Sequence, residues 1–164
     1  MAEQKIPMTP RGALKLKDEL KRRKEVERIK IVKAIEEARG HGDLSENADY
    51  SAAKEAQSFN EGRIKELEAM LALSNVIDPA TLSGAKVVFG ATVKLTDTDS
   101  GEEVVYAIVG ESEADIKSGR ISITAPLARA MIGRETGDTV QVRTPKGARE
   151  YEILAVTFCE IAYD

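Results

Sequence analysis

Apolar residues in the first half of the chain recur at three- and four-residue steps, the period of one helix face. One such stripe runs through residues 16–38, and a thinner one runs through residues 48–73. This spacing predicts two amphipathic helices. Thr9 can cap the first helix, and Pro10 suits its first position, where a missing backbone N–H costs nothing. Because only a short glycine-containing segment separates them, the two helices predict an antiparallel hairpin.

The stripe of the first helix is interrupted near its middle. Polar residues stand around Arg23 and Glu27, so we expect an imperfect seam between the helices there. The second helix offers the small residues Ala52 and Ala56 near the tip, which lets the helices approach closely. A helix of about 30 residues spans on the order of 45 Å. A hairpin of this kind could enter a deep channel on a partner.

In the second half, the period of the apolar residues changes to two. Runs rich in Val, Ile, Thr and Tyr predict strands at residues 86–89, 92–95, 104–109, 121–123, 139–142 and 151–156. Turn sequences at residues 99–101 and 145–147 favour antiparallel pairing. A short helix is expected after Pro126, over residues 127–132.

These elements predict an α+β protein, with an antiparallel α-helical coiled-coil hairpin followed by a small antiparallel-sheet domain. Pro79, Ser83 and Gly84 break the periodicity. We therefore predict a hairpin domain over residues 1–79 and a globular domain over residues 80–164.

Composition agrees with this division. Of the 164 residues, 32% are charged and only 4% are aromatic, which suits a solvated hairpin and a modest core. Residues 1–79 carry 15 Lys and Arg against 15 Asp and Glu, and residues 80–164 carry 9 against 13. The net charge of −4 argues against nonspecific coating of nucleic acid.

The expected compartment is the cytoplasm. The sequence has no apolar run long enough to span a bilayer and no signal-like start, so no membrane partner is expected. Cys159 is the only cysteine, which excludes an intrachain disulfide and favours a reducing cytosol. We expect Cys159 to be a small buried residue of the last strand.

The segment between the helices, residues 40–47, reads Gly-His-Gly-Asp-Leu-Ser-Glu-Asn. One interpretation is a capping box, in which Asp43 or Ser45 caps the second helix and Glu46 reaches back. The other is that Asp43 and Glu46 present hard oxygen ligands for Mg²⁺, which takes one or two carboxylates and keeps waters or phosphates. Two exposed carboxylates bind the ion weakly, so such a site needs ligands from a partner. His41 has no partners for a zinc set and reads as a loop residue.

The tip is one of several segments with a characteristic order and spacing: 6–9, 11–12, 42–50, 61–64, 88–93, 108–110, 113–115, 121–122 and 126–130. Together they resemble the bacterial Gre transcript cleavage (transcription elongation) factors over nearly the whole chain. Residues 52–55 and the opening segment are closer to the GreA branch of that family than to the GreB branch. The resemblance implies an FKBP-like fold for the second domain.

The resemblance also implies a function. Family members dock the globular domain at the rim of the RNA polymerase secondary channel and insert the hairpin. The tip then meets the catalytic centre in backtracked complexes, where the nascent RNA 3′ end is displaced. Asp43 and Glu46 are implied to help hold a second Mg²⁺ in trans, shared with the polymerase, and to orient the attacking water. The chain is thus expected to be an accessory factor, not an enzyme, and to bind no Mg²⁺ when isolated.

Further roles follow from the same resemblance. Arg39 and Lys54 match a basic patch that faces the RNA, although each can also be a solvated helix cation. Glu113, Asp115 and Pro126 match docking elements, but Ala125 stands where relatives often have Ser, which puts one hydroxyl contact in doubt. A monomer is expected, and DNA binding is a further property that the family implies.

Three rival functions remain open at this point. A channel-occupying inhibitor would share the fold, but the intact Asp43 and Glu46 argue against it. An FKBP-like isomerase or chaperone needs aromatic residues around a proline pocket, and the second half has few. A plain coiled-coil scaffold would leave the acidic tip without a purpose.

Overall fold

The computed structural model describes residues 4–43 and 46–163, which form two compact units. The first unit contains Gln4 and Ala13–Ser74, and the second contains Lys5–Gly12 and residues 75–163. Lys5–Gly12 belongs to the second unit because its backbone is bonded there. The Ile77 N–H, for example, donates to the Met8 carbonyl at 2.9 Å. The division into domains at residue 79 stays a prediction.

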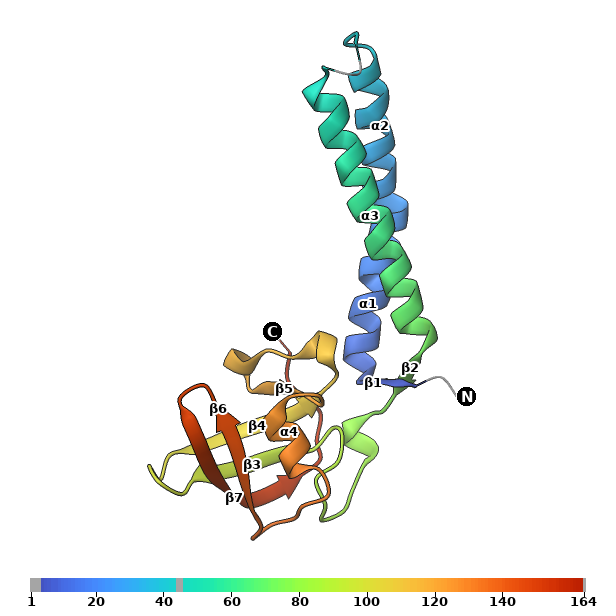
Figure 1. Ribbon diagram of the computed structural model, residues 1–164. Helices are drawn as coiled ribbons and strands as arrows, with labels where there is room; N and C mark the ends of the chain where they lie inside the picture. The colour runs from blue at the N-terminus through green and yellow to red at the C-terminus, as the bar shows by residue number, and fades with distance from the viewer. Residues whose placement is uncertain (1–3, 44–45, 164) are drawn as a thin grey trace. The chain divides into compact units, whose positions relative to one another are not determined.

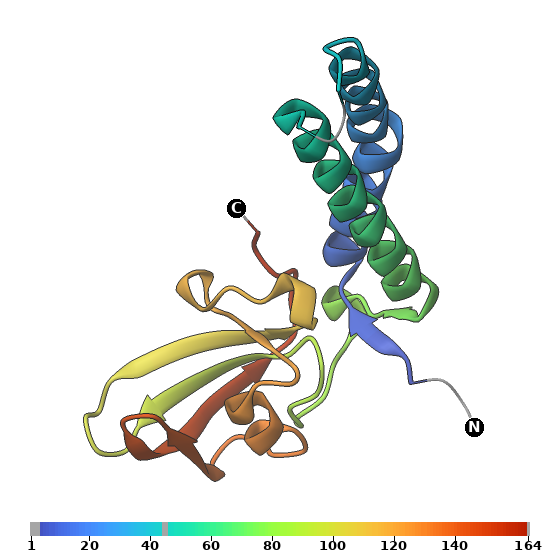
Figure 2. The same ribbon diagram turned by 45° about the horizontal axis from the view of Figure 1, so that its top comes forward.

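The first unit contains the predicted helical hairpin except for residues 10–12, the first residues of its first helix. Its first arm consists of α1 (Pro10–Arg22), a π-helical segment (Arg23–Glu27) and α2 (Arg28–Arg39). The second arm is α3 (Ala48–Ala72). Figures 1 and 2 both show α2 and α3 side by side. The buried residues of the hairpin, called the seam residues below, are Ala13, Leu16, Ile35 and Ala38 of the first arm and Ala53, Asn60, Ile64 and Leu67 of α3. The arms pack most closely between α2 and α3.

The start of α1 follows the sequence prediction. Pro10 is its first residue, and the buried Thr9 hydroxyl accepts a hydrogen bond from the Gly12 N–H at 3.1 Å. Thr9 therefore satisfies one of the backbone donors that a helix start leaves unpaired.

The second unit contains a curled five-stranded sheet (Figure 1). Its strands are β3 (Thr92–Asp97), β4 (Glu103–Val109), β5 (Arg120–Ser122), β6 (Thr139–Thr144) and β7 (Gly147–Thr157), in the order β5-β4-β3-β7-β6. The β3–β4 and β6–β7 pairs are antiparallel, as the turn sequences predict, while β5 lies parallel to β4. This confirms the α+β class with a mostly antiparallel sheet. The FKBP likeness stays a prediction.

The core of the second unit lies between the sheet and α4 (Pro126–Met131). Ala128 and Met131 of this helix are fully buried among Val93, Leu95 and Ile153 of the sheet. Burial of such side chains removes apolar surface from water and holds the unit together. Short 3₁₀ turns at Pro79–Thr81, Glu111–Glu113 and Ile116–Ser118 complete it.

Three expectations about the fold are wrong. Ala52 and Ala56 are exposed, and the small residue of α3 that is buried near the tip is Ala53. Residues 86–89 do not form a strand: Lys86 makes only an isolated bridge to Glu135, and Val87 exchanges backbone bonds with the segment after α4. The alternation there reflects a buried Val87 beside an exposed Val88. Cys159 lies beyond the end of β7 and is exposed.

Two short strands were not predicted from the sequence. β1 (Ile6–Met8) and β2 (Ser74–Val76) pair as a two-stranded sheet, and three residues are too few to show a period. Within the described residues, no helix has the length and apolar character needed to cross a membrane.

Candidate functional site at the hairpin tip

The first arm ends in a tight turn. The N–H groups of Gly40 and His41 donate to the carbonyls of Glu37 and Ala38, each at 3.1 Å. Gly42 then takes φ = +109°, a conformation that costs little only for glycine. The chain therefore leaves α2 in a tight turn directly before Asp43.

Asn47 caps α3, which corrects the capping-box interpretation of Asp43 and Glu46. Its Oδ1 accepts from the Tyr50 N–H at 3.0 Å, and its Nδ2 donates to the Ala38 carbonyl at 2.6 Å. One amide side chain thus starts α3 and ties it to the end of α2. The signal was present in the sequence, because Asn is a favoured N-cap residue and directly precedes the predicted helix. Ser45, the other candidate cap, lies outside the described residues.

Asp43 and Glu46 are exposed and line the same hollow, of about 380 Å³, at the tip. His41, Asn47, Ala48 and Asp49 complete its lining. His41 Nδ1 lies 3.7 Å from Asp49 Oδ2, so the sole histidine faces the third acid of the tip. The sequence prediction that the acids gather at the tip agrees with this arrangement.

The chemistry of these donors fits part of a Mg²⁺ site. Carboxylate oxygens are hard ligands, and Mg²⁺ in proteins typically takes only one or two of them. Among the described residues, no group of three or more His, Cys, Asp or Glu side chains is placed to hold a metal ion. Asp43 and Glu46 can supply carboxylate ligands to a Mg²⁺ ion, and whether they do so stays a prediction.

The predicted RNA-facing cations lie on the helices that flank the tip. Arg39 is the last residue of α2 and is exposed. Lys54 is exposed in the second turn of α3, and its Nζ donates to Gln57 Oε1 at 3.0 Å. Both positions suit contact with a ligand at the tip, and their role stays a prediction.

The three predicted docking residues differ in exposure. Pro126 is exposed at the first position of α4, and Ala125 before it offers no side-chain cap. Asp115 caps the turn at Ile116–Ser118 and is partly exposed, with an ion pair to Arg120 at 3.9 Å. Glu113, in contrast, is only 7% exposed, so its own contacts are with the interior of the second unit.

Family models place the chain in a class. The model described as "Transcription elongation factor, N-terminal" matches residues 6–76, and the model "Transcription elongation factor, GreA/GreB, C-term" matches residues 82–158. The first match covers the helical hairpin and the second covers most of the sheet unit. Fold and sequence together therefore define a protein of the transcription elongation factor class.

Curated relatives agree over almost the whole chain. Transcription elongation factor GreA of Beijerinckia indica is 62% identical over 154 residues, which cover 94% of this chain and 98% of the relative. GreA of Agrobacterium fabrum is 61% identical over 153 residues, covering 93% and 97%. The chain belongs to the GreA/GreB family of transcription elongation factors.

Solved structures of similar sequence include two transcription factors. A GreA/GreB factor from Nitrosomonas europaea is 28% identical, with 94% of this chain and 100% of that chain covered and a TM-score of 0.42. The GreA factor homolog Gfh1 of Thermus thermophilus is 28% identical, with 93% and 99% covered and a TM-score of 0.43. The family assignment rests on the sequence matches.

Proposed function

We propose that this chain stimulates the Mg²⁺-dependent cleavage of nascent RNA by bacterial RNA polymerase. In backtracked or arrested complexes, the hairpin enters the secondary channel and the polymerase cuts the RNA near its 3′ end, so that elongation resumes. The second unit docks at the channel rim. The observation that carries the proposal is the pair of exposed carboxylates, Asp43 and Glu46, which line one hollow while Asn47 does the capping.

The chemical role of the tip follows from its donors. Asp43 and Glu46 would hold a metal ion together with ligands of the polymerase, and their carboxylate oxygens would accept hydrogen bonds from the attacking water and so orient it. A second Mg²⁺ held jointly with the polymerase would activate that water and stabilise the charge of the cleaved phosphodiester. Arg39 and Lys54 are placed to contact RNA phosphates, and such contacts weaken as salt is raised.

Docking involves the exposed part of the second unit. Asp115 and Pro126 are exposed enough to touch the polymerase, whereas the buried Glu113 holds the shape of the segment that carries Asp115. Under this proposal the chain is an accessory factor that works as a monomer in the cytoplasm.

The test uses stalled, backtracked polymerase complexes with labelled RNA and Mg²⁺. The wild-type chain should shorten the RNA from its 3′ end. Asp43→Asn and Glu46→Gln should each lower the cleavage rate at least about tenfold, the loss typical of weakening a metal site, and added Mg²⁺ should restore part of it. Asp49→Asn is the matched control: it removes an acid of the same hollow and should change the rate little.

The other functions give different results in the same assay. Normal cleavage by both Asp43→Asn and Glu46→Gln would refute the metal role of the tip. RNA fragments formed without polymerase would mean that the chain is a nuclease itself. Slowed elongation without cleavage would identify a channel-occupying inhibitor.

A further inference from the structure

The first arm of the hairpin contains one wide turn. In the π-helical segment Arg23–Glu27, the Arg28 N–H donates to the Arg23 carbonyl, five residues back rather than the four of an α-helix. The segment reads Arg-Lys-Glu-Val-Glu, without the Gly or Pro that usually distorts a helix. Most of these residues favour an ordinary α-helix. The local sequence therefore does not explain the wide turn.

The spacing of seam residues does explain it. In a helical pair, seam positions repeat every seven residues. On α3, the buried Ala53, Asn60 and Leu67 follow this repeat without a break. On the first arm, the half-buried Leu20 and the buried Ile35 are 15 positions apart (35 − 20), one more than two heptads.

A second pair of seam residues gives the same excess. The buried Leu16 and Ala38 are 22 positions apart (38 − 16), one more than three heptads. The first arm thus holds one residue more than its partner between matching seam positions. A π-helical turn absorbs one extra residue, so the helix beyond it keeps its phase.

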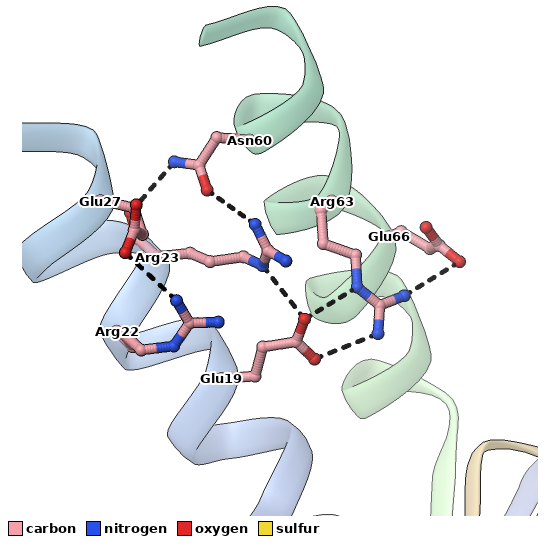
Figure 3. A network of polar contacts seen from close by, with 7 residues as sticks. All are labelled: Glu19, Arg22, Arg23, Glu27, Asn60, Arg63 and Glu66. Carbon is pink, nitrogen blue, oxygen red and sulfur yellow. Dashed lines mark hydrogen bonds and ion pairs between the residues drawn. The ribbon is translucent and has the colours of Figure 1, made fainter. Parts of the chain in front are cut away.

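A polar cluster with residues from both arms surrounds this turn (Figure 3). Asn60 is only 2% exposed; its Nδ2 donates to the Arg23 carbonyl at 3.1 Å, and its Oδ1 accepts from Arg23 Nη1 at 3.0 Å. Glu19 accepts from Arg23 Nε and from Arg63 Nε, each at 3.1 Å. Asn60 thus replaces an apolar seam residue where it can bond both the backbone and the side chain of the wide turn.

We propose that the π-helical segment is a built-in one-residue insertion that keeps the two halves of the first arm in one heptad phase, and that Asn60 recognises it. The phase matters at the tip, because Ala38 must meet α3 there: its carbonyl accepts from Asn47 Nδ2 at 2.6 Å. Asn60 is therefore a positioning residue for the tip. This inference does not depend on the proposed function.

Deletion of Glu25 tests directly whether the first arm holds one extra residue. Glu25 is exposed, and its removal makes Arg28 the fourth residue after Arg23, so the same N–H and carbonyl form an α-helical bond. When Asn60→Leu is also present, so that no buried amide loses its partners, deletion of Glu25 should leave the unfolding equilibrium constant the same or lower it. The matched control is deletion of Ser58, an exposed residue of α3 between Ala53 and Asn60. That deletion shortens a heptad with no wide turn to absorb the change, and should raise the constant at least about tenfold.

The role of Asn60 is tested by Asn60→Leu in two backgrounds. In the full chain it leaves polar groups of the wide turn without partners, and should raise the unfolding constant about tenfold. After deletion of Glu25 the turn is gone, so Asn60→Leu should be neutral or stabilising. Denaturant titration followed by circular dichroism measures all four proteins. An equal cost of Asn60→Leu in both backgrounds would overturn the recognition role.

Spin-label distances report on the phase itself. With Cys159→Ser removing the native thiol, cysteines at the exposed Lys17 and Glu55 carry labels on α1, before the wide turn, and on the tip side of Ser58 in α3. The distance should be unchanged by deletion of Glu25 and shifted by deletion of Ser58. A shift of equal size in both would refute the insertion, even if both proteins fold.

Discussion

At the scale of single residues, the buried Glu113 joins distant segments of the second unit. Its Oε2 accepts from the N–H groups of Thr9 and Gly110, each at 3.0 Å, and its Oε1 accepts from the hydroxyls of Thr9 and Tyr163. Burial, and then the bond to Glu113, raises the pKa of Tyr163, so this hydroxyl stays a donor. Because Glu113 stands in an acidic stretch, residues 111–115, the sequence suggests an exposed position. Its partners come from distant segments, which the sequence alone does not bring together.

The fit around Glu113 gives a stability prediction. A Cβ added at Gly12 would lie 2.2 Å from Glu113 Cδ, so Gly12→Ala must displace the carboxylate and should lower the free energy of unfolding by about 1–3 kcal/mol. Gly62→Ala is the matched control, because Gly62 is also helical and a Cβ there meets nothing within 4 Å. It should stabilise the protein by roughly 0.5–1 kcal/mol. Urea titration measures both, and a neutral Gly12→Ala would show that the cluster adapts freely.

At the scale of elements, ion pairs join the two arms of the hairpin. Arg63 binds both carboxylate oxygens of Glu19, each at 3.1 Å, and Arg28 binds those of Glu61 at 2.9 and 2.7 Å. The sequence analysis predicts a mixed-charge, solvated helical region. The structure adds that part of this charge is paired across the seam, and Glu19 is only 23% exposed.

This pairing makes the hairpin sensitive to acid. The hydrogen bond from Arg63 lowers the pKa of Glu19 below its ordinary value of 4.5. A folded-state pKa below the unfolded one contributes stability that is complete above pH 4.5 and is lost as the pH falls through the lowered pKa. Helicity followed against denaturant from pH 6 to about pH 3 should show this loss, and Glu19→Gln should reduce it. Glu66→Gln, which removes a 62%-exposed partner of Arg63, should leave most of the loss in place.

The elements also show where periodicity succeeds and where it fails. The long runs predicted the first arm as a single helix and placed α3, β3, β4 and β6 close to their observed bounds, because burial of one face requires the matching period. β7 begins at Gly147, four residues before its predicted start. Residues 86–89 were wrongly predicted to be a strand. Their alternating burial occurs in a loop in which Val87 is buried and Val88 is exposed. The π-helical segment appeared only as a gap in the apolar stripe. Counting heptads from Leu20 to Ile35 would have found the extra residue.

At the scale of the whole molecule, the sequence locates some candidate site residues better than others. Asp43 and Glu46 were recognisable because a short glycine-hinged turn between two helices keeps both carboxylates at one end of the hairpin. The division into a helical unit and a sheet unit is visible in the sequence, because the period of the apolar residues and the balance of charge both change between the two halves. What the sequence omits are the remaining metal ligands, which under the proposed function belong to the polymerase, and the interior position of Glu113.

The proposed function separates binding from chemistry, and a competition assay tests this. If the second unit supplies most of the affinity, Asp43→Asn/Glu46→Gln should still occupy polymerase, because neither substitution touches that unit. When this double variant is titrated against the wild-type chain, it should halve the cleavage rate at about equal concentration, because two ligands of equal affinity share one site equally. Adding Asp115→Ala and Pro126→Ala should abolish the competition. A tip variant that fails to compete would mean instead that the tip carboxylates themselves hold the chain in the polymerase.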